Sequence, residues 1–171
     1  VVAPNSPQSG KGHAITINST LTFEEINLEG PQKDYSLSGT PVDCVKFALD
    51  KILTRKPDLV VSGINHGANS SINVIYSGTM SAAVEAGVEG LQAIGFSLLD
   101  FSWDADFTQA KSHIQEIVKK VLENPMPKGV VLNVNIPKLA KDQIKGIRVC
   151  KQADAKWEES FDQRVNPHGK T

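Results

Sequence analysis

Runs of consecutive apolar residues alternate along the chain with segments whose apolar residues recur every three or four positions. The first pattern is typical of strands buried on both faces, and the second is typical of amphipathic helices. Buried strands are predicted at 1–3, 59–61, 92–99 and 129–137, and helices at 40–56, 80–87 and 107–122. Short alternating segments at 14–17, 21–26 and 34–37 predict a small antiparallel insert, and 144–150 predicts a peripheral strand.

This order of elements predicts a three-layer α/β fold in one domain, residues 1–171. The best-marked helix start is at Thr40, which is the expected cap, followed by Pro41 at the first helical position and Asp43 in the first turn. Asp104 or Asp106 is the expected cap of the later helix. Trp157 and Phe161 in the polar tail are spaced as one helical turn.

The stretch 59–87 is the most informative part of the chain. A predicted strand ends in a loop of serines, asparagines and glycines at 62–69, and Ser77-Gly78-Thr79 then opens an alanine-rich helix. The free N–H groups and the dipole of a helix start favour an anion, and phosphate is the expected one. An ordinary polar loop followed by an ordinary helix cap is the alternative interpretation.

Composition excludes several classes of protein. Apolar residues make up 40% and charged residues 22% of the chain, and the net charge is −1, so there is no basic field for polymeric nucleic acid. The sequence has no apolar run of the length of a membrane span, and we expect no signal peptide. Cys44 and Cys150 lack the spacing of a metal site, so we expect reduced thiols in a cytoplasmic protein without a membrane partner.

The two ends of the sequence suggest a piece of a longer protein. The chain begins with Val1-Val2-Ala3-Pro4, which resembles the second half of a buried strand, and it stops within a turn at 166–171. We therefore expect the first strand of the fold to precede Val1.

Loops that follow the strands of an open α/β sheet converge on one edge. Here they would bring together Ser9, the asparagines Asn65 and Asn69, and the helix start at Ser77. These groups include no carboxylate, although Mg²⁺ and Mn²⁺ sites usually contain one or two. The chain also lacks a nucleophile elbow and a Walker loop, so the carboxylates would have to come from the strand before Val1.

The chain contains four motifs: Val2-Ala3-Pro4 with Ser9-Gly10 and Gly12-His13; Ser38-Gly39-Thr40-Pro41-Val42-Asp43-Cys44-Val45-Lys46; Val61-Ser62-Gly63-Ile64-Asn65-His66-Gly67-Ala68-Asn69; and Tyr76-Ser77-Gly78-Thr79. In this order they resemble the SurE family of stationary-phase survival proteins, which are 5′/3′-nucleotidases. The resemblance implies a Rossmann-like sheet and a divalent metal, Mg²⁺ or Mn²⁺, one per subunit. It also implies a homodimer or homotetramer, with a C-terminal hairpin region beyond Thr171.

The resemblance also implies roles for particular residues. Ser9 and Asn65 match the serine and asparagine ligands of the family's metal, and the expected aspartate pair precedes Val1, so no catalytic residue is assigned within the chain. Asn69, Ser77, Gly78 and Thr79 match the phosphate-binding region. Lys11 and His13 flank the site without an assigned role.

The implied reaction is metal-assisted hydrolysis of nucleoside 5′- and 3′-monophosphates. With half of the metal site, the chain alone is expected to be inactive. Two alternatives remain open: a non-catalytic module that binds phosphate or nucleotide, and a hydrolase of other phosphoesters or polyphosphate.

Overall fold

The computed structural model describes residues 1–28 and 30–170. Its elements, in chain order, are β1 (Val2–Pro4), β2 (Phe23–Ile26), β3 (Asp34–Leu37), α1 (Pro41–Phe47), the π-helix η1 (Ala48–Ile52), β4 (Val60–His66), α2 (Asn73–Tyr76), α3 (Gly78–Val88), β5 (Ala93–Leu99), α4 (Thr108–Glu123), β6 (Leu132–Pro137) and the 3₁₀ helix η2 (Lys141–Gln143). Among these described residues, no helix is long and apolar enough to cross a membrane.

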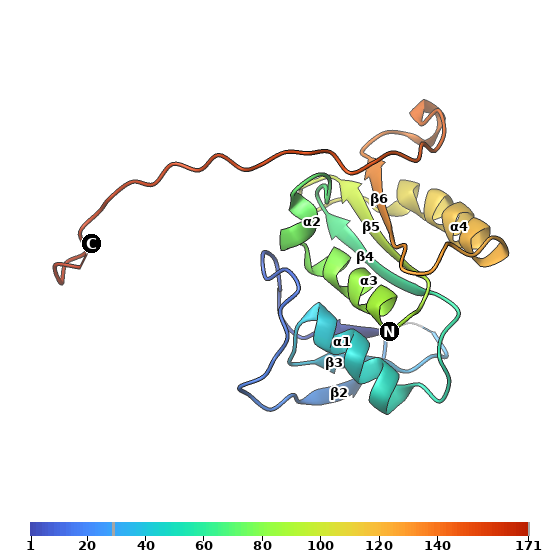
Figure 1. The fold of residues 1–171 in the computed structure, drawn as a ribbon, viewed down its shortest axis with the longest axis horizontal. Coiled ribbons are helices and arrows are strands. Elements are labelled where there is room, and N and C mark those ends of the chain that lie inside the picture. The colour runs from blue at the N-terminus through green and yellow to red at the C-terminus, as the bar shows by residue number, and fades with distance from the viewer. Residues whose placement is uncertain (29, 171) are drawn as a thin grey trace.

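The strands form two three-stranded sheets, in the orders β1-β3-β2 and β4-β5-β6 (Figure 1). The second sheet is parallel throughout. In the first sheet β1 is parallel to β3, and β2 is antiparallel to β3, which is the small antiparallel insert. The predicted α/β fold class is confirmed, although β1 and β4 are not paired with each other.

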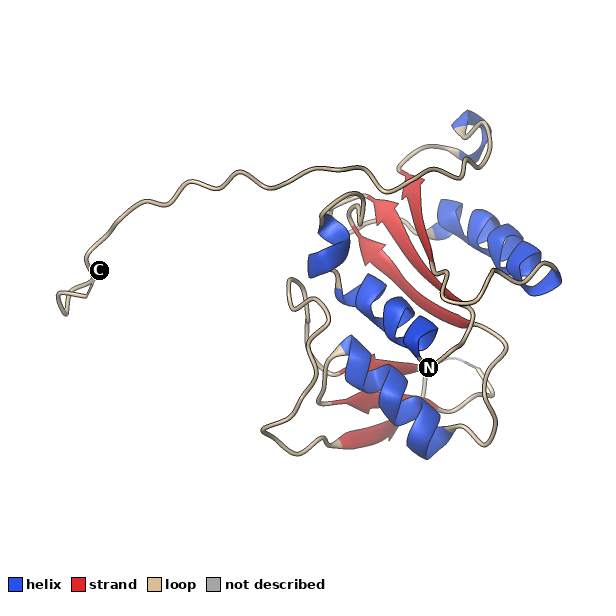
Figure 2. Cartoon of the chain, in the orientation of Figure 1, coloured by secondary structure: helices blue, strands red, loops and turns tan. Residues whose placement is uncertain are grey.

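The second sheet is covered by helices on both faces, so the fold has three layers at this point (Figure 2). Ile94, Phe96 and Leu98 of β5 pack with the apolar face of α4. Ala93, on the opposite face of β5, packs with α1 and α3. Gly95 lies on that face too, and a Cβ there would overlap Met80 of α3, so glycine allows the helix to lie close to the sheet.

Four predictions about elements are wrong. Residues 14–17 form no strand, because the N–H and hydroxyl of Thr16 instead donate to the Asp43 carboxylate, at 3.1 Å and 2.6 Å. Residues 144–150 form no strand and 157–161 form no helical turn; this tail is extended (Figure 1), and most of its apolar side chains, Trp157 and Phe161 among them, are exposed. The helix that starts after Thr40 ends at Ile52, before Pro57.

The capping predictions are mostly confirmed. Thr40 accepts from the N–H of Asp43, and the Asp43 carboxylate accepts from the N–H of Thr40, so the two residues form a capping box. Burial tends to raise the pKa of Asp43, but hydrogen bonds from Thr16 and Thr40 outweigh it and lower that pKa. At α4 the cap position is Phe107, and Asp106 accepts from the N–H of Thr108, whereas Asp104 does not cap the helix.

Candidate phosphate and metal site

The loop 5–13 carries Ser9 from the end of β1 to the junction of α2 and α3. The N–H of Gly12 donates to the carbonyl of Tyr76 at 3.2 Å. Gly12 has a φ of +54°, and a Cβ there would lie 2.6 Å from the carbonyl oxygen of Ile75, so only glycine allows this close approach. Ser9 is exposed, and its hydroxyl has no hydrogen-bond partner in the part of the chain that the structure describes.

Asn65 lies at the carboxyl end of β4, beyond a β-bulge that shifts the pairing with β5 between Ser62 and Asn65. Its side-chain amide nitrogen donates to the carbonyls of His66 and Gly67, at 2.8 Å and 2.9 Å. These two bonds fix the orientation of the amide group. The side-chain oxygen therefore points away from them, and it faces the hydroxyl of Thr79 at 3.5 Å.

The start of α3 lies between Ser9 and Asn65. Ser77 caps the helix by accepting from the N–H of Met80 at 3.1 Å. The N–H groups of Gly78 and Thr79 have no acceptor among the residues described here, as expected for the first turn of a helix. A Cβ on Gly78 would lie 3.7 Å from the carbonyl oxygen of Gln8, which places the Ser9 loop against this helix start.

Asn69 is buried, and it joins the loop after β4 to the other two strands of the sheet. Its side-chain amide donates to the hydroxyl of Ser97 on β5 at 2.8 Å. Its backbone N–H donates to the side chain of Asn135, and its carbonyl accepts from Asn133, at 2.8 Å and 2.7 Å. This network holds the loop in place. The sequence analysis did not predict the roles of Asn133 and Asn135 of β6, although two asparagines that alternate with apolar residues in a strand could have indicated them.

A second unpredicted cluster centres on Glu85, which lies on α3 with its side chain 9% exposed. One carboxylate oxygen accepts from Lys46 of α1 at 2.9 Å, and the other lies 2.8 Å from Nε2 of His13. Burial tends to raise the pKa of Glu85, but hydrogen bonds from Lys46 and His13 outweigh it and lower that pKa. The cluster ties the loop that carries Ser9 to the helix that begins at Gly78.

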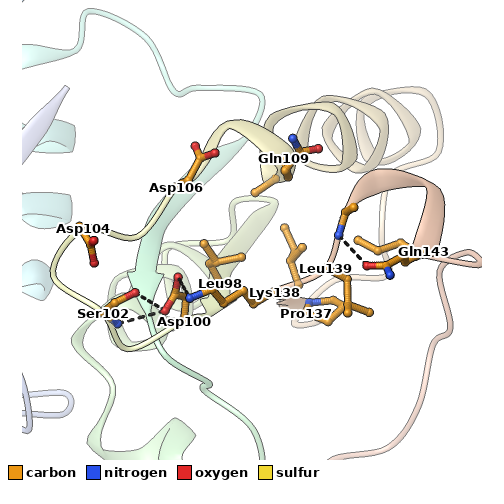
Figure 3. A pocket seen from close by; sticks show the side chains of 14 residues that line it. Leu98, Asp100, Ser102, Asp104, Asp106, Gln109, Pro137, Lys138, Leu139 and Gln143 are labelled. Carbon is orange, nitrogen blue, oxygen red and sulfur yellow. Dashed lines mark hydrogen bonds and ion pairs between the residues drawn. The ribbon is translucent and has the colours of Figure 1, made fainter.

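Behind the site, the loop after β5 is fixed at a pocket of about 440 Å³ between β5, β6 and α4 (Figure 3). The Asp100 carboxylate accepts from the hydroxyl and the N–H of Ser102, and it pairs with Lys138 at 2.9 Å. These contacts, with the Ser102 hydroxyl first, lower the pKa of Asp100 to about 2. Asp104 and Asp106 also line this pocket, but the described residues contain no group of three or more acidic, histidine or cysteine side chains that could hold a metal.

A groove of about 540 Å³ separates the two sheets. The edges of two strands form walls of the groove. Val2 and Ala3 line it from β1, and Val60 and Val61 line it from β4. Most of its lining residues are apolar, and Thr79 lies on its wall. Each edge belongs to an outer strand of its own sheet, so the facing backbone groups of both strands have no partner strand within the described residues.

The structure brings together five of the six predicted site residues. Ser9, Asn65, Ser77, Gly78 and Thr79 are linked by the contacts described above, whereas Asn69 is directed into the sheet network. The unpaired hydroxyl of Ser9 and the amide oxygen of Asn65, which accepts a long hydrogen bond of 3.5 Å from Thr79, lie beside free helix N–H groups. Such groups can bind an anion and contribute neutral ligands to a hard cation. The fold and this geometry define an α/β protein in which a helix start and neutral oxygen groups gather at the carboxyl ends of parallel strands.

Comparison with known proteins identifies the family. The profile of the family described as "Survival protein SurE" matches residues 1–159. A relative named 5′-nucleotidase SurE from Christiangramia forsetii is 66% identical over 99% of this chain, and one from Flavobacterium johnsoniae is 64% identical over 99%. The chain belongs to the SurE family, and the resemblance seen in the sequence motifs is confirmed.

A solved structure agrees with this assignment. The crystal structure of the SurE protein from Aquifex aeolicus is similar with a TM-score of 0.84 and 38% identity, over 99% of this chain and 67% of that one. The present chain spans 66% of the length of the two curated relatives.

Proposed function

We propose that this chain is part of a metal-dependent phosphomonoesterase that hydrolyses nucleoside 5′- and 3′-monophosphates to a nucleoside and phosphate. The observation that carries the proposal is the arrangement of Asn65 and the start of α3. The amide oxygen of Asn65 is turned toward Thr79, beside two unpaired helix N–H groups. Neutral oxygen ligands next to an anion-binding helix start suit a phosphoryl group held together with a hard cation.

The residues present fit such a cation in part. Ser9 offers an unpaired hydroxyl, and Asn65 offers an amide oxygen whose hydrogen bond from Thr79 is long, at 3.5 Å. Both are neutral oxygens of the kind that Mg²⁺ and Mn²⁺ accept, and we propose them as two ligands of one metal per subunit. The described residues supply no carboxylate cluster to accompany them. The negative charge needed for tight binding of the cation would then come from carboxylates on a further segment of the protein.

The groove between β1 and β4 offers a place for a further strand that could carry the missing negative charge. A strand between the two free edges, which Val2 and Val61 help to form, would complete both ladders and unite the sheets. The end of a parallel strand in this position would lie between Ser9 and Asn65. We propose that the acidic pair expected before Val1 lies on such a strand.

The residues of this chain then have separate tasks. When bound, the metal supplies Lewis-acid polarisation of the phosphoryl oxygens and lowers the pKa of water. The N–H groups of Gly78 and Thr79 bind non-bridging oxygens of the phosphate, where charge develops in the transition state. The Glu85 cluster holds the Ser9 loop on α3. In the reaction, the bond from phosphorus to the ester oxygen breaks, a bond to a water oxygen forms, and the released nucleoside oxygen takes up a proton.

One observation favours a second function. Because no acidic cluster lies near Asn65 within the described residues, a module that binds phosphate or nucleotide without hydrolysis needs only what is present. The two functions differ in whether phosphate is released. A hydrolase of other phosphoesters or polyphosphate would use the same groups.

The test is phosphate release from a panel of nucleoside monophosphates with Mn²⁺ or Mg²⁺, with and without EDTA. It uses this chain and a longer chain that includes the residues preceding Val1. We expect metal-dependent release from the longer chain, abolished in Asn65→Ala and retained in Ser70→Ala, which changes an exposed residue of the same loop. Binding of AMP without release by either chain would leave the binding module, and release insensitive to Asn65→Ala would place the chemistry elsewhere.

Partners and location complete the proposal. We propose a nucleoside monophosphate as the small-molecule partner and a homodimer or homotetramer as the assembly. A cytoplasmic location suits the two free cysteines, Cys44 and Cys150.

A further inference from the structure

Two aromatic side chains of the loop after β5 are almost fully exposed. Phe101 is 78% and Trp103 is 102% exposed. Both follow Asp100, at the carboxyl end of the middle strand of the parallel sheet. Exposing two large aromatic side chains within three residues leaves apolar surface that a ligand could cover.

The loop is held in a fixed position, so these side chains are presented in a defined place. Asp100 accepts two hydrogen bonds from Ser102 and pairs with Lys138 of the next strand end (Figure 3). The carbonyl of Ser102 lies 3.1 Å from Nδ1 of His66. These contacts fix the loop on both sides of Phe101.

The same contacts place Phe101 beside the phosphate and metal site. A Cβ on Gly67 would overlap the Phe101 ring, so the ring lies directly over the backbone of Gly67. The carbonyl of Gly67 accepts from the side chain of Asn65 at 2.9 Å. Gly67 therefore contacts both the ring of Phe101 and the side chain of Asn65, the proposed metal ligand.

We propose that Phe101, together with Trp103, is the platform on which the substrate's nucleobase stacks. This proposal rests on the proposed function and adds a specificity determinant to it. A nucleoside monophosphate has its charged phosphate and its flat base at opposite ends, and the chain places an anion site and exposed aromatic rings side by side. Base stacking on an aromatic side chain accepts every base, and larger purines cover more of the ring than pyrimidines.

The position of the rings favours a nucleotide over a second protein copy as the occupant. Phe101 packs on the backbone that orients Asn65, so anything bound on this ring also borders the phosphate site. Two acidic residues, Asp104 and Asp106, follow in the same loop, and their carboxylates can accept hydrogen bonds from the exocyclic amino groups of adenine, guanine or cytosine.

The fluorescence of Trp103 can report the binding of a nucleotide to this platform. The chain has two tryptophans, so the variant Trp157→Phe leaves Trp103 as the only fluorescent indole. In this background, with Mn²⁺ present, AMP should quench the emission with saturation, and ribose 5-phosphate, which lacks the base, should not. Phe101→Ala should raise the Kd of AMP about fivefold or more and change that of ribose 5-phosphate little. Phe101→Tyr should restore the affinity for AMP.

The matched control is Phe161→Ala, which removes an exposed ring from the tail and should leave the AMP affinity unchanged. Equal Kd values for AMP in the parent and Phe101→Ala would overturn the platform. So would dissociation of an oligomer by Phe101→Ala without a change in AMP binding, since the rings would then lie between copies. If phosphate release still depends on Asn65 in either case, the proposed function stands and only the platform fails.

Discussion

The carboxylate of Glu85 connects three segments of the site, and its neutralisation should weaken the whole arrangement. Glu85 lies on α3 with a buried side chain, Lys46 reaches it from α1 at 2.9 Å, and His13 reaches it from the Ser9 loop at 2.8 Å. The variant Glu85→Gln keeps the size and shape of the side chain and removes its charge.

The size of the effect follows from these contacts. A hydrogen bond to a charged group contributes about 1.5–3 kcal/mol in a protein. The side chains of His13 and Lys46 are 41% and 51% exposed, so water and salt weaken both interactions. We therefore expect Glu85→Gln to lower the free energy of unfolding by about 2 kcal/mol, which lowers the Tm by about 4–8 °C for a chain of this size.

The assay is thermal unfolding followed by circular dichroism from pH 7 to pH 3. The folded-state pKa of Glu85 is lowered from its ordinary value of 4.5, so the charge stabilises the fold above that pH. This contribution is lost as the pH falls through the lowered pKa. The difference in Tm between the parent and Glu85→Gln should therefore be full at pH 7 and should shrink in acid.

The matched control is Glu89→Gln on the same helix. Glu89 lies 3.7 Å from the amine of Lys46 and is 40% exposed, so its loss should change the Tm by less than about 2 °C. Equal decreases for the two variants, or a Glu85→Gln difference that is constant down to pH 3, would refute the reasoning.

Three further predictions concern single positions around the site. Gly67→Ala should cost about 1–3 kcal/mol of unfolding free energy, because Gly67 has a φ of +83° and the new Cβ would displace the Phe101 ring; chemical denaturation measures this. Ser77→Ala should cost about 1 kcal/mol by removing the cap of α3, measured in the same way. Burial raises the pKa of the Cys44 thiol to about 12, so a thiol-reactive disulfide at pH 8 should modify only the exposed Cys150 until the protein is unfolded.

The sequence predicted the parts of the fold that depend on local chemistry. Thr40, Pro41 and Asp43 form the expected helix start, since capping depends on residues within one turn of each other. The buried strand β5 was predicted as 92–99 and runs from Ala93 to Leu99, because a continuous apolar run of this length suits a strand covered on both faces.

Features set by long-range pairing were harder to predict. Segment 14–17 alternates like a strand, but Thr16 binds the Asp43 carboxylate instead, a contact 27 residues away along the chain. Segment 144–150 alternates too, yet no strand pairs with it in the structure. An alternating pattern shows that a segment could pair and does not identify a partner.

The same limit applies to the site. Ser9, Asn65 and the α3 start were predicted because strand-end loops converge in this class of fold. The ion pairs of Glu85 and the exposed ring of Phe101 depend on how α1, α3 and the loop after β5 pack together. Neither has a motif of its own, so only the three-dimensional arrangement relates them to the site.

The central claim is that Asn65 is a ligand of a metal beside the helix start. Its most direct test is Mn²⁺ binding, followed by the electron paramagnetic resonance signal of free Mn²⁺, in the chain extended to include the residues before Val1. Loss of groups that only support metal ligands weakens affinity about 10–100-fold, so Asn65→Ala should raise the Mn²⁺ Kd at least about tenfold, with Ser70→Ala, at an exposed position of the same loop, close to the parent. An unchanged Kd in Asn65→Ala, or equal losses in both variants, would contradict the assignment of the site.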